Sequence, residues 1–197
     1  MKKIGLFFGS FNPIHVGHLV IANHIAQSDL LDEVWFVVSP QNPFKEKKSL
    51  LEDYHRLALV NEAIEDNQKL KSCDIEFSMP KPSYTSDTLA YLMDKYPKYE
   101  FSLIMGEDNI KSFHKWKNYE VILKNHSIIV YPRMGVNDKS VAKSEIITHK
   151  NISVLENIPV MKISASYIRE RIKEGKSVAY LLTEKVEKYV DEMGFYR

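Results

Sequence analysis

Short apolar runs and helical patterns of apolar residues alternate along this chain. Residues 2–10 (KKIGLFFGS) and 33–40 (EVWFVVSP) are continuous apolar runs, and residues 18–28 (HLVIANHIAQS) between them carry apolar side chains at helical spacing. Strands that are apolar on both faces and are separated by a helix are typical of a parallel sheet covered on both sides. The first forty residues therefore predict a βαβ unit with a right-handed crossover.

The same alternation continues through the rest of the chain. It predicts strands at 73–79, 99–108, 127–133 and 152–157, and helices at 52–67, 86–96, 107–113, 118–125, 164–175 and 183–194. A capping-box pattern, Ser49 with Glu52, precedes the first of these helices, and Gly175 and Gly194 are expected to end the last two.

These elements together predict an α/β fold, a Rossmann-like doubly wound parallel sheet with a C-terminal helical segment. In such a sheet, ligands bind beyond the carboxyl ends of the strands. The length of 197 residues, without an internal repeat or a marked boundary, predicts one domain over residues 1–197.

Composition narrows the function classes. The chain has 27 basic and 26 acidic residues, so no overall field attracts nucleic acid or a membrane, and a charged ligand needs a local cluster. Cys73 is the single cysteine; it excludes an intrachain disulfide and is expected to be a small buried residue rather than a catalytic thiol. The first apolar run is too short for a signal peptide, and no run is long enough for a membrane helix. We expect a cytoplasmic protein that binds neither nucleic acid nor a membrane.

The stretch GSFNPIHVGH, residues 9–18, follows the first strand and points to an anion site. His15 and His18 are three residues apart, and Gly17 removes a side chain beside both. His18 falls near the start of a helix, where backbone N–H groups and the helix dipole favour an anion. Ordinary solvated or capping histidines fit this spacing too, and a metal pair is a weaker alternative. The Walker and G-x-G-x-x-G fingerprints are absent.

A second stretch, KISASYIRERI at residues 162–172, has the pattern of another helix start. Ser164 or Ser166 is expected to cap the helix, and Arg169 lies one turn beyond Ser166. The hydroxyls, the first amides and the guanidinium can together hold a phosphate. Taken alone, an ordinary capped amphipathic helix explains this stretch equally well.

The two stretches together resemble the signature of the nucleotidyltransferase superfamily, in which H-x-G-H follows the first strand and I-S-x-[ST]-x-I-R lies near the C-terminus. Within it, the chain is most similar to the bacterial nicotinate-nucleotide adenylyltransferases. The segments SPQNPFKEK, PSYTSDTL and MGEDNIKSFHKW match further elements of that family. Departures are Ser10 for threonine, Asn12 for aspartate and Phe8-Gly9 where two glycines are usual.

The resemblance implies transfer of the adenylyl group of ATP to nicotinate mononucleotide, with Mg²⁺ carried on the ATP phosphates. It assigns His15, His18 and Arg169 to catalysis. It places ATP against Gly9, Ser10, Phe11, His15, His18, Gly106, Asp108, Arg133, Ile163, Ser164, Ser166 and Arg169. It places the mononucleotide against Asn42, Lys45, Tyr84, Thr85 and Trp116.

This reaction needs no protein nucleophile, because one substrate phosphate attacks another. Two polyanions must be brought together, so we expect positively charged imidazole and guanidinium groups and helix N-termini to converge on the triphosphate. A nicotinate carboxylate beside Thr85, at a helix start, predicts preference for nicotinate over nicotinamide mononucleotide. Arg56, on the helix at 52–67, is expected to form a surface salt bridge.

Two alternatives remain open on the sequence alone. One is another small-substrate nucleotidyltransferase of the same superfamily. The other is a nucleotide-binding sensor that has the fold without turnover. The sequence also leaves open whether the chain forms a homo-oligomer.

Overall fold

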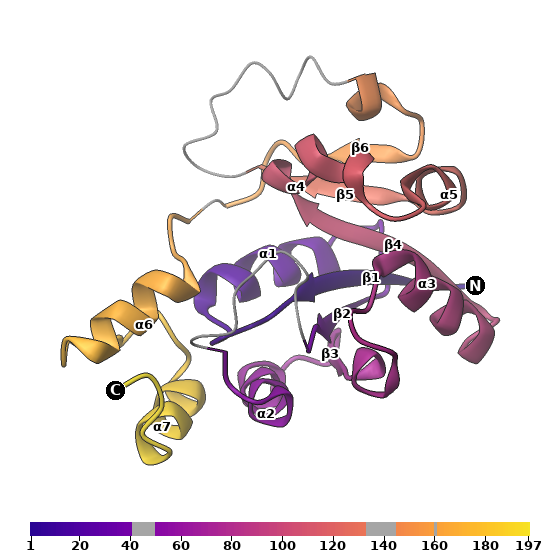
Figure 1. The fold of residues 1–197 in the computed structure, drawn as a ribbon. Coiled ribbons are helices and arrows are strands. Elements are labelled where there is room, and N and C mark those ends of the chain that lie inside the picture. Colours follow the sequence, from indigo (N-terminus) through magenta and orange to yellow (C-terminus); the bar gives the residue numbers. More distant parts are fainter. Residues whose placement is uncertain (41–49, 133–144, 160) are drawn as a thin grey trace.

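A computed structural model of the chain describes residues 1–40, 50–132, 145–159 and 161–197. Its centre is a six-stranded sheet with the strand order β3-β2-β1-β4-β5-β6 (Figure 1). The strands are β1 (Lys2–Gly9), β2 (Glu33–Val38), β3 (Leu70–Cys73), β4 (Tyr99–Gly106), β5 (Ile128–Tyr131) and β6 (Ile152–Val154). Every neighbouring pair is parallel.

The strand order reverses between β1 and β4, which lie side by side in the centre of the sheet. From β1 the chain first extends the sheet through β2 and β3, and later extends it the other way through β4, β5 and β6. This confirms the predicted doubly wound parallel sheet. The crevice at such a reversal, beyond the carboxyl ends of the strands, is where this architecture binds ligands.

Helices cover both faces of the sheet. They are α1 (Val16–Ala26), α2 (Asp53–Ile64), α3 (Thr85–Lys95), α4 (Glu107–Ser112), α5 (Tyr119–Asn125), α6 (Ala165–Lys173) and α7 (Glu184–Glu192). Short 3₁₀ turns are η1 (Ile75–Ser78), η2 (Phe113–Lys115) and η3 (Glu145–Thr148). Figure 1 shows α6 and α7 on the side toward which β1 and β4 point, which confirms the predicted C-terminal helical segment.

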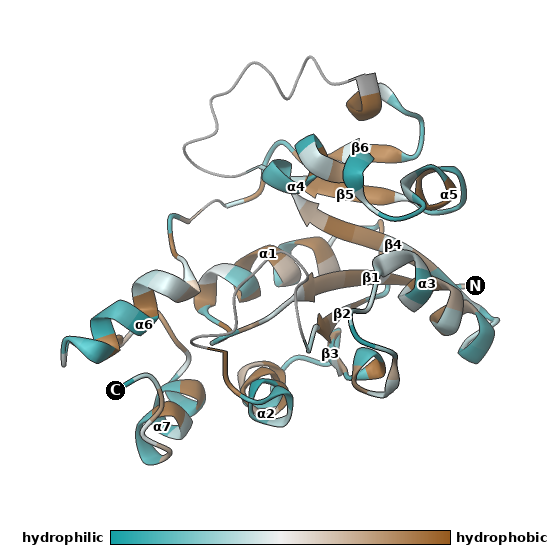
Figure 2. Cartoon of the chain, in the orientation of Figure 1, coloured by the Kyte–Doolittle hydropathy of each residue, from teal (hydrophilic) through white to brown (hydrophobic). Residues whose placement is uncertain are grey.

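The core has one cluster of buried apolar side chains on each face. One cluster joins the sheet to α1, α2, α6 and α7, for example through Ile25, Leu59, Ile168 and Val186. The other joins it to α3, α4 and α5. The apolar colour of the central strands in Figure 2 follows from burial on both faces, which is why these strands read as continuous apolar runs.

One predicted strand is misplaced. The strand expected at 73–79 ends at Cys73, and Ile75–Ser78 forms η1 instead. The hydroxyl of Thr88 donates a 2.7 Å hydrogen bond to the buried Glu76 carboxylate, a tertiary contact that an alternating sequence pattern does not reveal. Helix α2 begins at Asp53 with Glu52 as its N-cap residue, one position after the predicted start, and Ser49 of the predicted capping box lies outside the described residues. No helix in the described ranges has the length and apolar character needed to cross a membrane.

Candidate active site

The turn after β1 is shaped by one inward-facing aromatic ring. Phe11 has a positive φ of 44°, and its side chain is 2% exposed. Its ring packs against Phe36, at 5.3 Å between centroids, and against Phe7. A Cβ at Gly9 would lie 2.7 Å from the Phe11 ring, so only glycine fits at that position. The turn therefore buries the Phe11 ring beneath its own backbone at the carboxyl edge of the sheet.

The two histidines of the first motif stack at the start of α1. Their ring centroids are 3.7 Å apart, and the planes differ by 24°. His15 is the N-cap residue of α1, and its backbone N–H donates to Nδ1 of His18 at 3.3 Å. Because Nδ1 accepts this bond, the neutral ring carries its proton on Nε2. The geometry therefore leaves Nε2 as the ring nitrogen of His18 that can donate to a ligand.

Gly17 leaves room for the stacked histidines and lies next to Ile163 of the second motif. A Cβ at Gly17 would lie 3.1 Å from the His15 ring and 3.7 Å from Cβ of Ile163. Ile163 directly precedes the start of α6, so the starts of α1 and α6 are neighbours. The structure therefore brings two helix N-termini close together, and each of them can bind an anion.

Helix α6 presents the other predicted phosphate ligands. Ser164 is its N-cap residue, and its hydroxyl accepts from the Tyr167 N–H at 3.2 Å. Arg169 donates from Nη1 to the Asn12 carbonyl at 2.8 Å and from Nη2 to the Ser166 hydroxyl at 3.4 Å. Arg169 and Asn12 are 157 positions apart in the chain, so this contact joins the two sequence motifs directly.

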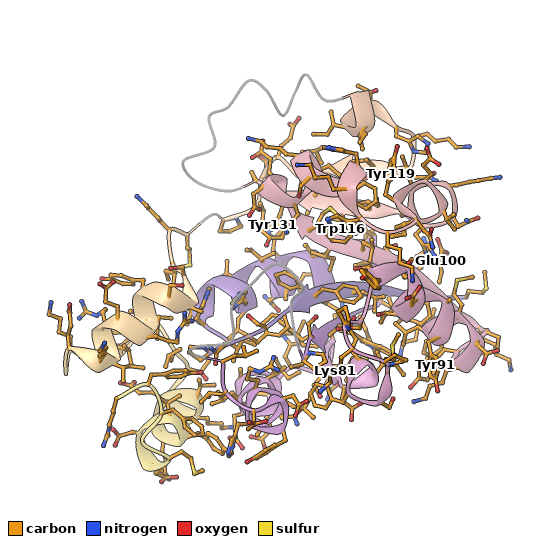
Figure 3. The ribbon with its side chains drawn as sticks, viewed as in Figure 1. Lys81, Tyr91, Glu100, Trp116, Tyr119 and Tyr131 are labelled. Carbon is orange, nitrogen blue, oxygen red and sulfur yellow. The ribbon has the colours of Figure 1, made fainter. Side chains whose placement is uncertain are left out.

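The ends of β4 and β5 form the next part of the site. A Cβ at Gly106 would lie 2.6 Å from Oδ1 of Asp108 and 3.2 Å from the Tyr131 hydroxyl. Tyr131 lies at the end of the sheet that faces α6, opposite Glu100 (Figure 3). The Phe7 ring contacts both Tyr131 and His18, with centroids 5.8 and 6.1 Å away. Sequence reasoning missed Tyr131, which lies within the strand predicted at 127–133 and ends β5 in the structure.

Two of the predicted mononucleotide residues, Tyr84 and Thr85, lie at the start of α3. Tyr84 is the N-cap residue of α3, and Nζ of Lys117 lies 4.7 Å from its ring centroid. Lys117 also pairs with Asp87 in the first turn of α3, at 2.9 Å. The neighbouring Trp116 is half-buried and packs on Phe113 (Figure 3). Lys117, the residue after Trp116, thus contacts the start of α3 and is a cation that sequence reasoning missed.

Arg56 is buried, which overturns the expected surface salt bridge. The side chain is 1% exposed, and its hydrogen-bond partners among the described residues are backbone carbonyls. Its partners are the carbonyls of Ser10 at 2.8 Å, Ser39 at 2.7 Å, Pro40 at 3.2 Å and Leu51 at 2.9 Å. Burial lowers the pKa of the Arg56 guanidinium from its ordinary value. Arg56 therefore ties the turn after β1 to the end of β2.

Three predicted site residues, Asn42, Lys45 and Arg133, lie outside the described residues. Within the described ranges, no group of three or more His, Cys, Asp or Glu side chains could hold a metal ion. The described part of the site consists of backbone turns, two helix starts, stacked imidazoles and a guanidinium. Such groups bind anions, above all phosphates.

Comparisons with known proteins agree with this geometry. A cytidylyltransferase-like family model matches residues 6–171. A Flavobacterium psychrophilum protein named "Probable nicotinate-nucleotide adenylyltransferase" is 56% identical over 195 residues, with 99% of each chain covered. A Flavobacterium johnsoniae protein of the same name is 54% identical over 195 residues, again with 99% of each chain covered.

The chain belongs to the nicotinate-nucleotide adenylyltransferase family. The fold agrees with this membership. The structure of Plasmodium falciparum nicotinic acid mononucleotide adenylyltransferase complexed with NaAD is similar, with a TM-score of 0.82 at 23% identity. That comparison covers 100% of this chain and 98% of the other. In this family member, the site described above is therefore the candidate active site.

Proposed function

We propose that this protein transfers the adenylyl group of ATP to nicotinate mononucleotide, which yields deamido-NAD and pyrophosphate. One observation carries the proposal. The Arg169 guanidinium bonds to the Asn12 carbonyl at 2.8 Å and so brings the second motif onto the turn that holds His15 and His18. The names of the full-length relatives support the same reaction.

The reaction is a displacement at the α-phosphorus of ATP. A phosphate oxygen of the mononucleotide forms a bond to that phosphorus, and the bond from the α-phosphorus to the bridging oxygen breaks as pyrophosphate leaves. Negative charge moves toward the leaving group, so the protein must offer donors placed in advance. We assign the Nε2–H of His18 to the oxygens around the α-phosphorus, with His15 stacked behind it.

The start of α6 is assigned to the rest of the triphosphate. Ser164, Ser166 and Arg169 converge there, and we propose that they hold the β- and γ-phosphates. Arg169 is partly engaged with the Asn12 carbonyl, which fixes the direction of the guanidinium plane before ATP arrives. Such pre-organisation saves the reorganisation that a freely rotating arginine would need. Gly106 and Asp108 are assigned to the ribose.

The start of α3 is the proposed nicotinate subsite. Thr85 begins this helix, so a carboxylate there meets N–H groups and the positive end of the helix dipole. Lys117 adds positive charge 4.7 Å from the Tyr84 ring centroid, and Trp116 offers an aromatic face for the pyridine ring. A neutral carboxamide gains less from each of these charges, which is the physical basis for a preference for nicotinate.

Mg²⁺ is proposed to enter with ATP, because Mg²⁺ keeps several of its waters and prefers phosphate oxygens to all-protein cages. Bound to ATP, the ion neutralises part of the phosphate charge. A cytoplasmic location remains a prediction of the sequence, and the sequence leaves open whether the chain forms a homo-oligomer.

The test is release of pyrophosphate by the purified protein with ATP and Mg²⁺, with nicotinate and nicotinamide mononucleotide offered in turn. We expect turnover with both, and a kcat/KM at least tenfold higher for nicotinate mononucleotide. Equal kcat/KM values would refute the carboxylate subsite. Pyrophosphate release only with a different phosphorylated substrate would favour a sibling nucleotidyltransferase, and ATP binding without any turnover would favour a sensor.

A further inference from the structure

The segment that follows α7 reaches into the phosphate-binding turn. The Tyr196 hydroxyl donates a 2.8 Å hydrogen bond to Oδ1 of Asn12, across 184 positions of sequence. Asn12 is 4% exposed, and the same Oδ1 accepts from the Leu51 N–H at 3.2 Å. The carbonyl of Asn12 accepts from Arg169. Asn12 is thus the junction of the turn after β1, the approach to α2, helix α6 and the last segment.

Several contacts fix the position of the last segment, residues 194–197. Gly194 has a φ of 64°, and the Phe195 N–H bonds back to the Val190 carbonyl at 3.0 Å. The Phe195 ring packs 4.8 Å from the His55 ring on α2, and Arg197 pairs with Asp191. These contacts anchor the segment to α7 and α2, so the position of the Tyr196 ring is determined from both sides.

The Tyr196 hydroxyl lies near two positively charged groups, the guanidinium groups of Arg56 and Arg169. Tyr196 itself has a positive φ of 65°, a conformation that a tyrosine adopts only when surrounding contacts enforce it. Burial raises the pKa of Tyr196, and the nearby Arg169 and Arg56 guanidinium groups oppose that rise. The hydroxyl therefore stays protonated at neutral pH, and it donates to Asn12 beside two buried or half-buried cations.

We propose that Tyr196 is a positioning residue for ATP. By holding the Asn12 side chain, it fixes the Asn12 carbonyl that orients Arg169 toward the triphosphate. This inference rests on the proposed function for its kinetic readout. Tyr196 acts through Asn12 and Arg169, so removal of its hydroxyl should weaken the binding of ATP and leave the mononucleotide subsite at α3 unchanged.

The test compares Tyr196→Phe with Tyr189→Phe. Both variants remove one tyrosine hydroxyl from the α7 region; that of Tyr189 lies 3.1 Å from Nδ1 of His55, away from Asn12. We expect Tyr196→Phe to raise the KM for ATP and its calorimetric dissociation constant by about 3- to 10-fold, the range for one lost hydrogen bond. The KM for nicotinate mononucleotide should change by less than about twofold. Tyr189→Phe should leave the KM for ATP unchanged, even where it lowers the thermal midpoint.

A double-mutant cycle with Asn12→Ala tests the route of the effect. Asn12→Ala should itself weaken ATP binding, and Tyr196→Phe should add little in that background because its partner is gone. Full additivity of the two substitutions, equal increases in both KM values, or an unchanged dissociation constant for ATP would each overturn the proposal. ATP binding without mononucleotide tests Tyr196 independently of turnover, whereas failure of the wild-type protein to form deamido-NAD would instead refute the proposed function.

Discussion

Arg56→Met is the most informative perturbation of the scaffold around the site. The side chain is 1% exposed and donates to four backbone carbonyls that belong to three separate segments. Methionine has a similar length and fills much of the same space, but it donates no hydrogen bond. The substitution therefore removes the cross-link and leaves the volume of the site nearly unchanged.

The magnitude follows from the bonds that are lost and from the charge that is removed. A hydrogen bond to a charged group contributes about 1.5–3 kcal/mol, so four such bonds set an upper bound of about 6–12 kcal/mol. Removal of the guanidinium also relieves the desolvation of a buried charge, which offsets several kcal/mol. We expect a net loss of about 3–5 kcal/mol in the free energy of unfolding. For a chain of this size, that loss lowers the thermal midpoint by about 6–20 °C.

Thermal unfolding followed by circular dichroism measures this loss, with Arg197→Met as the matched control. Arg197 is exposed and pairs with Asp191 on the surface, where such a pair contributes at most about 1 kcal/mol. Arg56→Lys should give an intermediate loss, because one ammonium group cannot reach carbonyls on three segments. Equal midpoints for Arg56→Met and Arg197→Met would refute the structural role of Arg56.

Two further predictions concern single side chains. His18→Ala should lower kcat by about 10²- to 10³-fold while the circular dichroism spectrum stays unchanged, because it removes one pre-positioned donor to the developing charge. A loss of tenfold or less would show that His18 does not stabilise this charge. Burial raises the pKa of the Cys73 thiol to about 11, so only about one thiol in a thousand is ionised at pH 8. Cys73 should therefore react with a thiol reagent only after denaturation, and rapid labelling of the folded protein would contradict its burial.

The sequence predicted the central strands well because the physics of a buried strand is local. Strands β1, β2 and β4 lie inside a parallel sheet with helices on both faces, so every position favours an apolar residue. The strand at 73–79 was misplaced because a buried 3₁₀ turn can carry the same alternation. The contact that stabilises η1, between Glu76 and Thr88, joins two elements, and no pattern within one segment encodes it.

The residues of the candidate site likewise fall into those that a local motif marks and those that it does not. His15, His18, Ser164 and Arg169 stand in compact motifs at helix starts, and the structure brings them together. Their assigned roles remain predictions. Tyr131, Lys117 and Tyr196 are placed near the site by contacts between distant segments, which no pattern within one segment encodes.

Arg56 is different, because its sequence did contain a signal. Leu59 and Val60, three and four positions further along α2, are fully buried, and Ile64 is 6% exposed. Residues at this spacing share one helix face, so Arg56 belongs to the buried face of α2. A charged residue on such a face must find partners inside the protein, and the carbonyls at the ends of neighbouring strands and turns are the nearest acceptors.

The bond from Arg56 has a further consequence for the charge of the site. Arg56 bonds to the carbonyl of Ser10, and Arg169 bonds to the carbonyl of Asn12, so both draw backbone oxygens of one turn toward themselves. In a trans peptide the carbonyl and the next N–H point in opposite directions, so the bond to Arg56 turns the Phe11 N–H to the far side. The Asn12 carbonyl precedes Pro13, which has no N–H, so Arg169 orients no amide hydrogen in this way. An N–H that points away from the internal cation is a donor that a phosphate can use. We therefore expect Arg56 to aid anion binding through the peptide that it orients, and Arg169 through its own charge.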